Sequence, residues 1–151
     1  PTIVEWPGTI EHRVSHYPSG TIDMFLTLID IAGLSPDSIN AVNDGVSLVP
    51  VFKNEEPARR EKPMGFRVNA GQAWLDNDWK LVRNYTSGED DPFELYNVVG
   101  DPSESNNLID QRPDIAARMM KELAAWNASI EKSIVGADYP DDRVVQNDHE
   151  S

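Results

Sequence analysis

MGFRVNAGQAWLDNDWKLVRNY, residues 64–85, carries the clearest structural pattern in the chain. Apolar and polar residues alternate along 64–69, 72–77 and 78–85, which is the period of a half-buried β-strand. Asn77 and Asp78 make a tight turn between the last two segments, because both residue types suit two-residue hairpin turns. A fourth alternating segment, FELYNV, follows at 93–98. The short connections predict an antiparallel meander of four strands.

The helix that covers this sheet is predicted at 110–134. Pro113 suits the first helical turn, and Asp114 suits its positive amino end. One apolar stripe runs along the helix at steps of three and four residues. It consists of Ile115, Met119, Leu123, Trp126 and Ile130. We therefore predict an α+β unit, a small four-stranded antiparallel sheet packed by a C-terminal helix.

The first 63 residues predict different elements. TIVEW at 2–6 is typical of a short strand, and TIDMFLTLIDIAG at 21–33 predicts a helix, with Asp23 in its first turn and Gly33 as the left-handed residue that ends it. Apolar side chains surround this helix almost completely, so it requires burial on most sides. The charged, proline-bounded segment at 53–63 predicts an exposed linker.

Composition excludes several classes of function. Lys and Arg number 13 against 26 Asp and Glu, so the formal net charge is −13 and no basic face for nucleic acid is visible. Cysteine is absent, which excludes disulfides, zinc-thiolate sites and a cysteine nucleophile. No apolar run is long enough to span a membrane. Because the chain opens on a strand-like segment without Met, we expect it to be a piece of a longer protein.

DPSESNN at 101–107 offers carboxylates and amides that resemble metal ligands. A calcium loop requires oxygen ligands at alternate positions and a closing Glu, and this spacing is absent. Asp-Pro is instead typical of a type I turn, with Ser103 or Asn106 capping a helical turn. We predict no metal ligand and no catalytic residue in this chain.

Three residues are candidates for contact with a substrate: His16, Arg67 and Trp74. His16 lies in a loop without a nucleophile-elbow pattern, so a loop histidine without a catalytic role is the alternative. Arg67 and Trp74 lie on predicted strands, as do Trp79 and Arg83. Arginine and aromatic side chains bind sulfate and sugar rings, whereas core or hairpin packing is the alternative role, above all for Trp79.

Five segments occur in an order that resembles the carboxyl-terminal third of a type I sulfatase. They are PTIVEWPGTIE, VSHYPSGTIDMFLTLIDIAGL, NDGVSLVPVF, KPMGFRVNAGQAWLDNDWKLVRN and FELYNVVGDPSESNNL. The similarity covers residues 1–132 and is greatest to arylsulfatase and N-acetylgalactosamine-6-sulfatase-like members of the alkaline-phosphatase-like superfamily. It implies that 1–52 is the end of a large α/β sulfatase domain (strand, loop and buried helix), 53–63 a linker, 64–135 a C-terminal subdomain and 136–151 a polar tail.

The resemblance also implies a parent hydrolase that cleaves sulfate esters, with sulfated sugars as one expected class. Its nucleophile is a formylglycine made within Cys/Ser-x-Pro-x-Arg, and a calcium ion binds the sulfate. This chain has no Cys and no Ser-x-Pro-x-Arg, so the catalytic residues are expected outside it and the isolated chain is expected to be inactive. The implied partners are the remainder of the catalytic domain and a sulfated small molecule or carbohydrate. A periplasmic, extracellular or lysosomal location is expected on the same ground.

Two alternatives stay open at this point. The first alternative to a sulfatase region is a non-catalytic module that binds carbohydrate or protein. The second is the tail of a related phosphodiesterase or phosphonate hydrolase. The second alternative implies two transition metals upstream in place of one calcium ion. Neither nucleic acid nor a membrane is expected as a partner.

Overall fold

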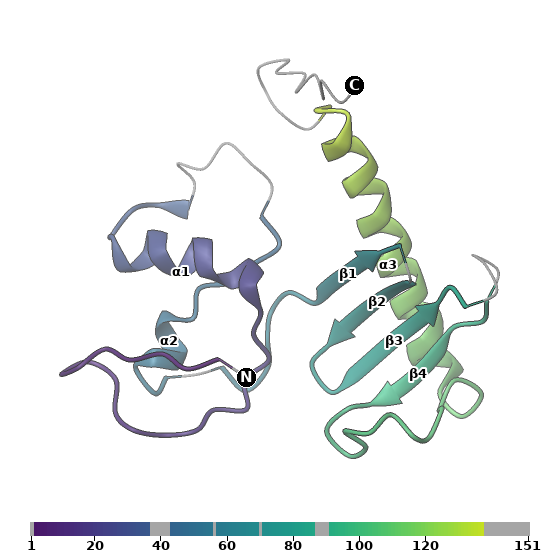
Figure 1. Ribbon diagram of the computed structural model, residues 1–151, viewed down its shortest axis with the longest axis horizontal. Coiled ribbons are helices and arrows are strands. Elements are labelled where there is room, and N and C mark those ends of the chain that lie inside the picture. The colour runs from purple at the N-terminus through teal and green to yellow at the C-terminus, as the bar shows by residue number, and fades with distance from the viewer. Residues whose placement is uncertain (1, 37–42, 56, 70, 87–90, 138–151) are drawn as a thin grey trace. The chain divides into compact units, whose positions relative to one another are not determined.

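The computed structural model describes the chain except for residues 1, 37–42, 56, 70, 87–90 and 138–151 (Figure 1). The described residues form two compact units: unit 1 extends to Met64, and unit 2 begins at Gly65. Most of the expected polar tail lies outside the described residues, as does the middle of the loop that follows the third strand.

The predicted four-stranded meander is confirmed. Strands β1 (Met64–Val68), β2 (Gly71–Asp76), β3 (Trp79–Asn84) and β4 (Glu94–Asn97) form one sheet in the order β1-β2-β3-β4. Asn77 has a φ of 54°, the left-handed backbone that the β2–β3 turn requires.

Helix α3 (Pro113–Ile134) covers one face of this sheet, as its apolar stripe predicts (Figure 1). The strand register places Trp74 beside Leu81 and Leu81 beside Leu95, so one row of apolar side chains faces the helix. The buried cluster consists of Trp74, Leu81, Leu95, Ala116, Met119 and Leu123. Full burial of each large side chain stabilises the fold by about 1.5–3 kcal/mol, so unit 2 has a core of its own.

The other face of the sheet carries apolar side chains that remain accessible. Phe66 and Val68 of β1 are 51% and 66% exposed, because alternate residues of a strand point to opposite faces. Lys80 lies on the same face and pairs with Glu104, with Nζ 2.6 Å from Oε1. Two hollows lie on this face. Phe66 and Lys80 contribute to the lining of both.

The DPSESNN segment forms the predicted turn, but a different residue holds it together. Neither Ser103 nor Asn106 is the cap. Instead the Asp101 carboxylate accepts hydrogen bonds from the backbone N–H groups of Ser105 and Asn106, both at 2.8 Å. These bonds, that from Asn106 first and then those from the serine hydroxyls, hold the pKa of Asp101 below its ordinary value of 3.8. Asn107 Oδ1 also accepts from Leu95 N at 3.1 Å, which ties the turn to β4.

Unit 1 contains the predicted helix. A 3-10 turn, η1 (Thr21–Asp23), leads into α1 (Met24–Ile31), and Gly33 follows with a φ of 67°, as expected of the residue that ends a helix. A second short helix, α2 (Val49–Phe52), was not predicted, because four residues with a proline among them carry no helical period.

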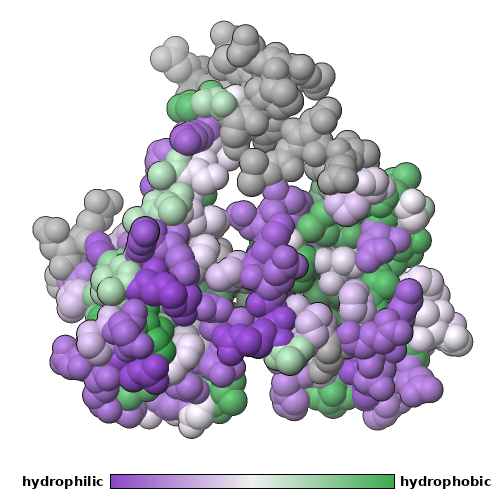
Figure 2. Space-filling model, turned by 180° about the vertical axis from the view of Figure 1, so that it is seen from behind, coloured by the Kyte–Doolittle hydropathy of each residue, from purple (hydrophilic) through white to green (hydrophobic). Residues whose placement is uncertain are grey.

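Apolar side chains of α1 reach the surface of unit 1. Met24, Phe25 and Leu28 are 44%, 50% and 61% exposed. Figure 2 shows hydrophobic residues on the surface of the part of the chain that contains this helix. Unit 1 therefore does not supply the burial on most sides that the sequence predicts for α1. Any further burial would have to come from contacts outside unit 1.

Two observations differ from the expectations for unit 1. Residues 2–6 form no strand, since strand geometry requires a hydrogen-bonded neighbour and no described residue pairs with them. The segment 53–63 is not exposed throughout, because Arg60 is only 3% exposed. Its guanidinium forms an ion pair with Asp23, Nη2 to Oδ1 at 2.7 Å, and neither side chain is accessible to solvent.

Candidate functional site

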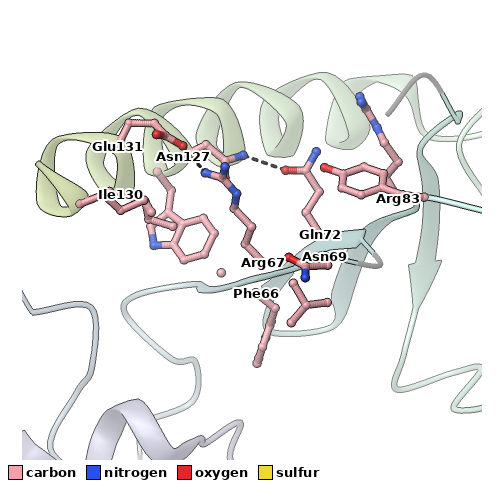
Figure 3. Close-up of a pocket in the computed structure, with 13 residues that line it drawn as sticks. Phe66, Arg67, Asn69, Gln72, Arg83, Asn127, Ile130 and Glu131 are labelled. Atoms are coloured by element: carbon pink, nitrogen blue, oxygen red, sulfur yellow. Dashed lines mark hydrogen bonds and ion pairs between the residues drawn. The ribbon is translucent and has the colours of Figure 1, made fainter. Parts of the chain in front are cut away.

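A groove of about 1150 Å³ lies in unit 2, between strands β1–β3 and the carboxyl-terminal half of α3 (Figure 3). Strand alternation decides which side chains line it. Arg67 of β1 faces α3, while Phe66 points to the opposite side of the sheet. Gly65, two residues before Arg67, shares the face toward α3 and lies against Trp126. Gln72 and Arg83 are register partners on β2 and β3.

The same alternation explains why polar side chains lie next to the apolar core on the sheet face toward α3. Gln72 lies two residues before Trp74, and Arg83 lies two residues after Leu81, so each pair shares one face of the sheet. The helical stripe continues in parallel from Leu123 into the groove-lining residues. These residues are Trp126, Asn127, Ile130, Glu131 and Ile134.

Glycine at position 65 permits the close approach of helix and strand. A Cβ atom built on Gly65 would lie 2.4–2.6 Å from three atoms of the Trp126 indole, closer than real Cβ atoms come to other atoms. The indole therefore rests directly on the backbone of β1. It also packs against the Trp74 ring, with centroids 5.9 Å apart, which fixes its position at the boundary between core and groove.

The groove combines positive charge with amide groups. Arg67 Nη1 lies 2.5 Å from Glu131 Oε1, in a pair whose side chains are 43% and 59% exposed. The Arg83 guanidinium lies 3.8 Å from the centroid of the Phe93 ring. Asn127 Nδ2 donates to Gln72 Oε1 at 2.8 Å, and Figure 3 shows this bond bridging helix and sheet.

Charge and hydrogen bonding both leave capacity for a ligand here. Arg67 and Arg83 against Glu131 give the groove lining a formal charge of +1, in a chain whose net charge is −13. Asn127 Oδ1 is buried and accepts no hydrogen bond from the described residues. A buried acceptor without a donor costs about 1–3 kcal/mol, so such atoms often mark a site where something else donates.

The three candidate contact residues have different surroundings. Arg67 lines the groove. Trp74 is only 7% exposed and donates its indole N–H to Glu122 Oε2 at 3.0 Å, so its ring contributes to the core. His16 belongs to unit 1, where its side chain is exposed. The structure thus groups Arg67 with Arg83 and the amides.

Gln72 and Asn127 were not identified from the sequence as site residues. The available signal was Asn127 directly after Trp126, which places an amide beside the apolar stripe. Gln72 becomes a groove residue only through its register with Arg83, and register is not apparent from residue types alone.

The implied calcium ion does not fit the described part of the chain. Within it, no three or more His, Cys, Asp or Glu side chains come together in a way that could hold a metal. The turn carboxylate Asp101 is occupied by backbone and hydroxyl donors instead. None of the helices described is both long and apolar enough to cross a membrane.

Comparison with known proteins identifies sulfatases as relatives. The "Sulfatase" of Formosa agariphila is 30% identical over 145 residues, which cover 83% of this chain and 26% of that protein. The choline-sulfatase of Rhizobium meliloti is 31% identical over 150 residues, covering 88% of this chain and 28% of that protein. The chain therefore spans about a quarter of the length of these curated relatives.

Solved structures show the same fold. Ps i-CgsB in complex with k-i-k-neocarrahexaose matches 73% of this chain and 24% of its own, with a TM-score of 0.59 and 22% identity. BT4656 in complex with its substrate D-glucosamine-2-N,6-O-disulfate matches with a TM-score of 0.53 and 24% identity, over 73% of this chain and 24% of its own. A family model described as N-sulphoglucosamine sulphohydrolase, C-terminal, matches residues 1–129 of the 151. This chain belongs to that family of sulfatase C-terminal regions.

Proposed function

We propose that this chain completes a sulfatase that hydrolyses sulfate esters of carbohydrates, and that the catalytic residues lie in polypeptide outside it. The observation that carries the proposal is the family match over residues 1–129, combined with the absence of a metal-holding cluster among the described residues. The formylglycine and calcium that the resemblance implies belong, on this proposal, to the part of the enzyme that precedes such C-terminal regions.

Carbohydrate is the proposed substrate class because it recurs among the relatives. The N-acetylgalactosamine-6-O-sulfatase of Bacteroides thetaiotaomicron is 25% identical over 134 residues. The choline-sulfatase relative supports a small sulfate ester as the other candidate class. We propose an exported or lysosomal location, a compartment in which sulfated carbohydrates are encountered.

The proposal is tested with two polypeptides. One is the 151-residue chain, and the other joins it to preceding sequence from its source, to the full length of the curated relatives. Each is incubated with N-acetylgalactosamine 6-sulfate, choline sulfate, and a matched phosphate diester and phosphonate ester. We expect the longer polypeptide to release sulfate and the 151-residue chain to release none.

Three results would contradict the proposal. Sulfate release by the chain alone would place catalysis inside it. Hydrolysis of only the phosphorus esters by the longer polypeptide would favour the phosphodiesterase or phosphonate hydrolase alternative. Inactivity of the longer polypeptide on every ester, with a folded spectrum, would favour the non-catalytic binding module.

A further inference from the structure

We propose that the groove between β1–β3 and α3 is a binding site for a sulfated oligosaccharide, with Arg67 as the contact for a sulfate group. The choice of a sulfated sugar rests on the proposed function, whereas the groove as a ligand site rests on its own geometry. No reaction is assigned to it. Its role is to hold part of a carbohydrate chain against the C-terminal unit.

The shape of the groove favours an extended ligand over a single small anion. Arg67 lies on β1 and Arg83 on β3, with β2 between them. Neighbouring strands are about 4.8 Å apart, so the backbones that carry these two cations are separated by about 10 Å. One sulfate does not bridge that distance, whereas an oligosaccharide with more than one anionic group does.

Arg67 can exchange its ion pair with Glu131 for a ligand at low cost. Its pair with Glu131 is formed between side chains that are 43% and 59% exposed. Exposed pairs of this kind contribute about 0–1 kcal/mol, because both groups are well hydrated. Two oxygens of a sulfate group accept two parallel N–H bonds from a guanidinium, as the two oxygens of a carboxylate do, so the exchange replaces the bond to Glu131 with equivalent bonds.

The remaining lining supplies what a sugar ring needs. Tyr85 and Trp126 offer amphipathic aromatic surfaces, and the Gln72 and Asn127 amides offer donors and acceptors for hydroxyl groups. Asn127 Oδ1 lacks a donor among the described residues, and a sugar hydroxyl is a donor of the right kind. Mixed apolar and polar linings with a few charged groups are usual in ligand sites.

The test is a binding titration of the isotope-labelled 151-residue chain, with no turnover involved. The probes are a chondroitin 6-sulfate hexasaccharide, the same hexasaccharide after desulfation, and inorganic sulfate. The readout is the NMR signal of the Trp126 indole N–H together with the backbone amides of β1. We expect saturable shifts with the sulfated hexasaccharide, and much weaker shifts with the other two probes.

Three variants give the titration its controls. Arg67→Ala should weaken binding about tenfold, the effect of losing one charge-assisted hydrogen-bonded contact. Glu131→Gln should strengthen binding about two- to fivefold, because the competing carboxylate is removed. Lys132→Ala removes a cation of α3 that does not line the groove, and it should change affinity by less than about twofold.

The outcomes separate this proposal from the proposed function. Equal affinity for the desulfated hexasaccharide, equal losses in Arg67→Ala and Lys132→Ala, or the absence of groove shifts with the sulfated probe would each overturn the binding site. Because the titration does not depend on hydrolysis, a longer polypeptide without sulfatase activity would refute the proposed function and leave the binding result standing.

Discussion

The buried ion pair of unit 1 gives the sharpest prediction about stability. Arg60→Ala removes a guanidinium whose two terminal nitrogens donate to both Asp23 carboxylate oxygens, at 2.7 and 2.9 Å. Both side chains are inaccessible to solvent. The substitution therefore leaves a carboxylate buried without its counter-charge, and we expect unit 1 to be strongly destabilised.

The magnitude follows from what remains around Asp23. Removing one partner of a buried ion pair costs about 3–5 kcal/mol, because the other charge stays desolvated. Here the carboxylate keeps two backbone donors, Gly20 N at 2.8 Å and Val46 N at 2.9 Å. These bonds offset part of the desolvation, so we expect the lower end of that range, about 3 kcal/mol.

The assay must report on unit 1 alone, because two compact units need not unfold together. Native-state hydrogen exchange meets this need. The amide of Val46, which donates to Asp23, should exchange about a hundredfold faster in Arg60→Ala, the factor that corresponds to about 3 kcal/mol. The amide of Leu81, in the core of unit 2, should keep its protection.

Two controls decide whether the reasoning is right. Arg59→Ala removes the neighbouring exposed arginine and should change stability by less than about 0.5 kcal/mol. The double variant Asp23→Asn with Arg60→Met strands no charge, so it should lose clearly less than the two single variants summed. A cost below about 1 kcal/mol for Arg60→Ala, or strict additivity in the double variant, would refute the account.

Three further predictions concern other parts of the chain. Gly65→Ala should lower the stability of unit 2 by about 1–3 kcal/mol in urea unfolding, because its Cβ overlaps the Trp126 indole. The pKa of Asp101 is lowered in the folded state, so the stabilisation from its hydrogen bonds is complete above the ordinary pKa of 3.8. This stabilisation is lost as the pH falls through the lower folded-state pKa, and the NMR shift of the Ser105 amide should report the loss. Leu28→Glu, at a side chain that is 61% exposed, should reduce binding of an apolar dye while changing stability by less than about 0.5 kcal/mol.

Unit 2 could be predicted from the sequence because its determinants are local. Alternation along β2 and β3, the Asn77 turn and the stripe through Met119 and Leu123 each specify one element, and together they specify how the elements pack. Arg60 could not be predicted in the same way. It stands in a run of charges that is typical of a solvated segment, and its partner Asp23 is 37 residues away. Only the tertiary fold brings the two together.

The groove was partly predictable for the same physical reason. Arg67 was identified by residue type, but the residues that line the groove with it depend on strand register and on where α3 crosses the sheet. A shift of one residue in the β2–β3 pairing would turn Gln72 to the other face and remove it from the site. Trp74 is the opposite case, a residue whose type is typical of sugar sites but which lies in the core. Its register partner is the core residue Leu81, and the pairing places both side chains under α3.

Each unit leaves some apolar side chains exposed, and their positions bear on function. In unit 2, α3 covers the apolar residues on one face of the sheet, while Phe66 and Val68 on the other face are 51% and 66% exposed. In unit 1, Phe25 and Leu28 of α1 are likewise at least half exposed, and exposed apolar surface of this kind often marks a contact surface. If this chain completes a sulfatase, as proposed above, polypeptide from outside the chain should cover α1. Loss of apolar-dye binding when the chain is joined to that polypeptide would support this expectation, and unchanged dye binding would exclude it.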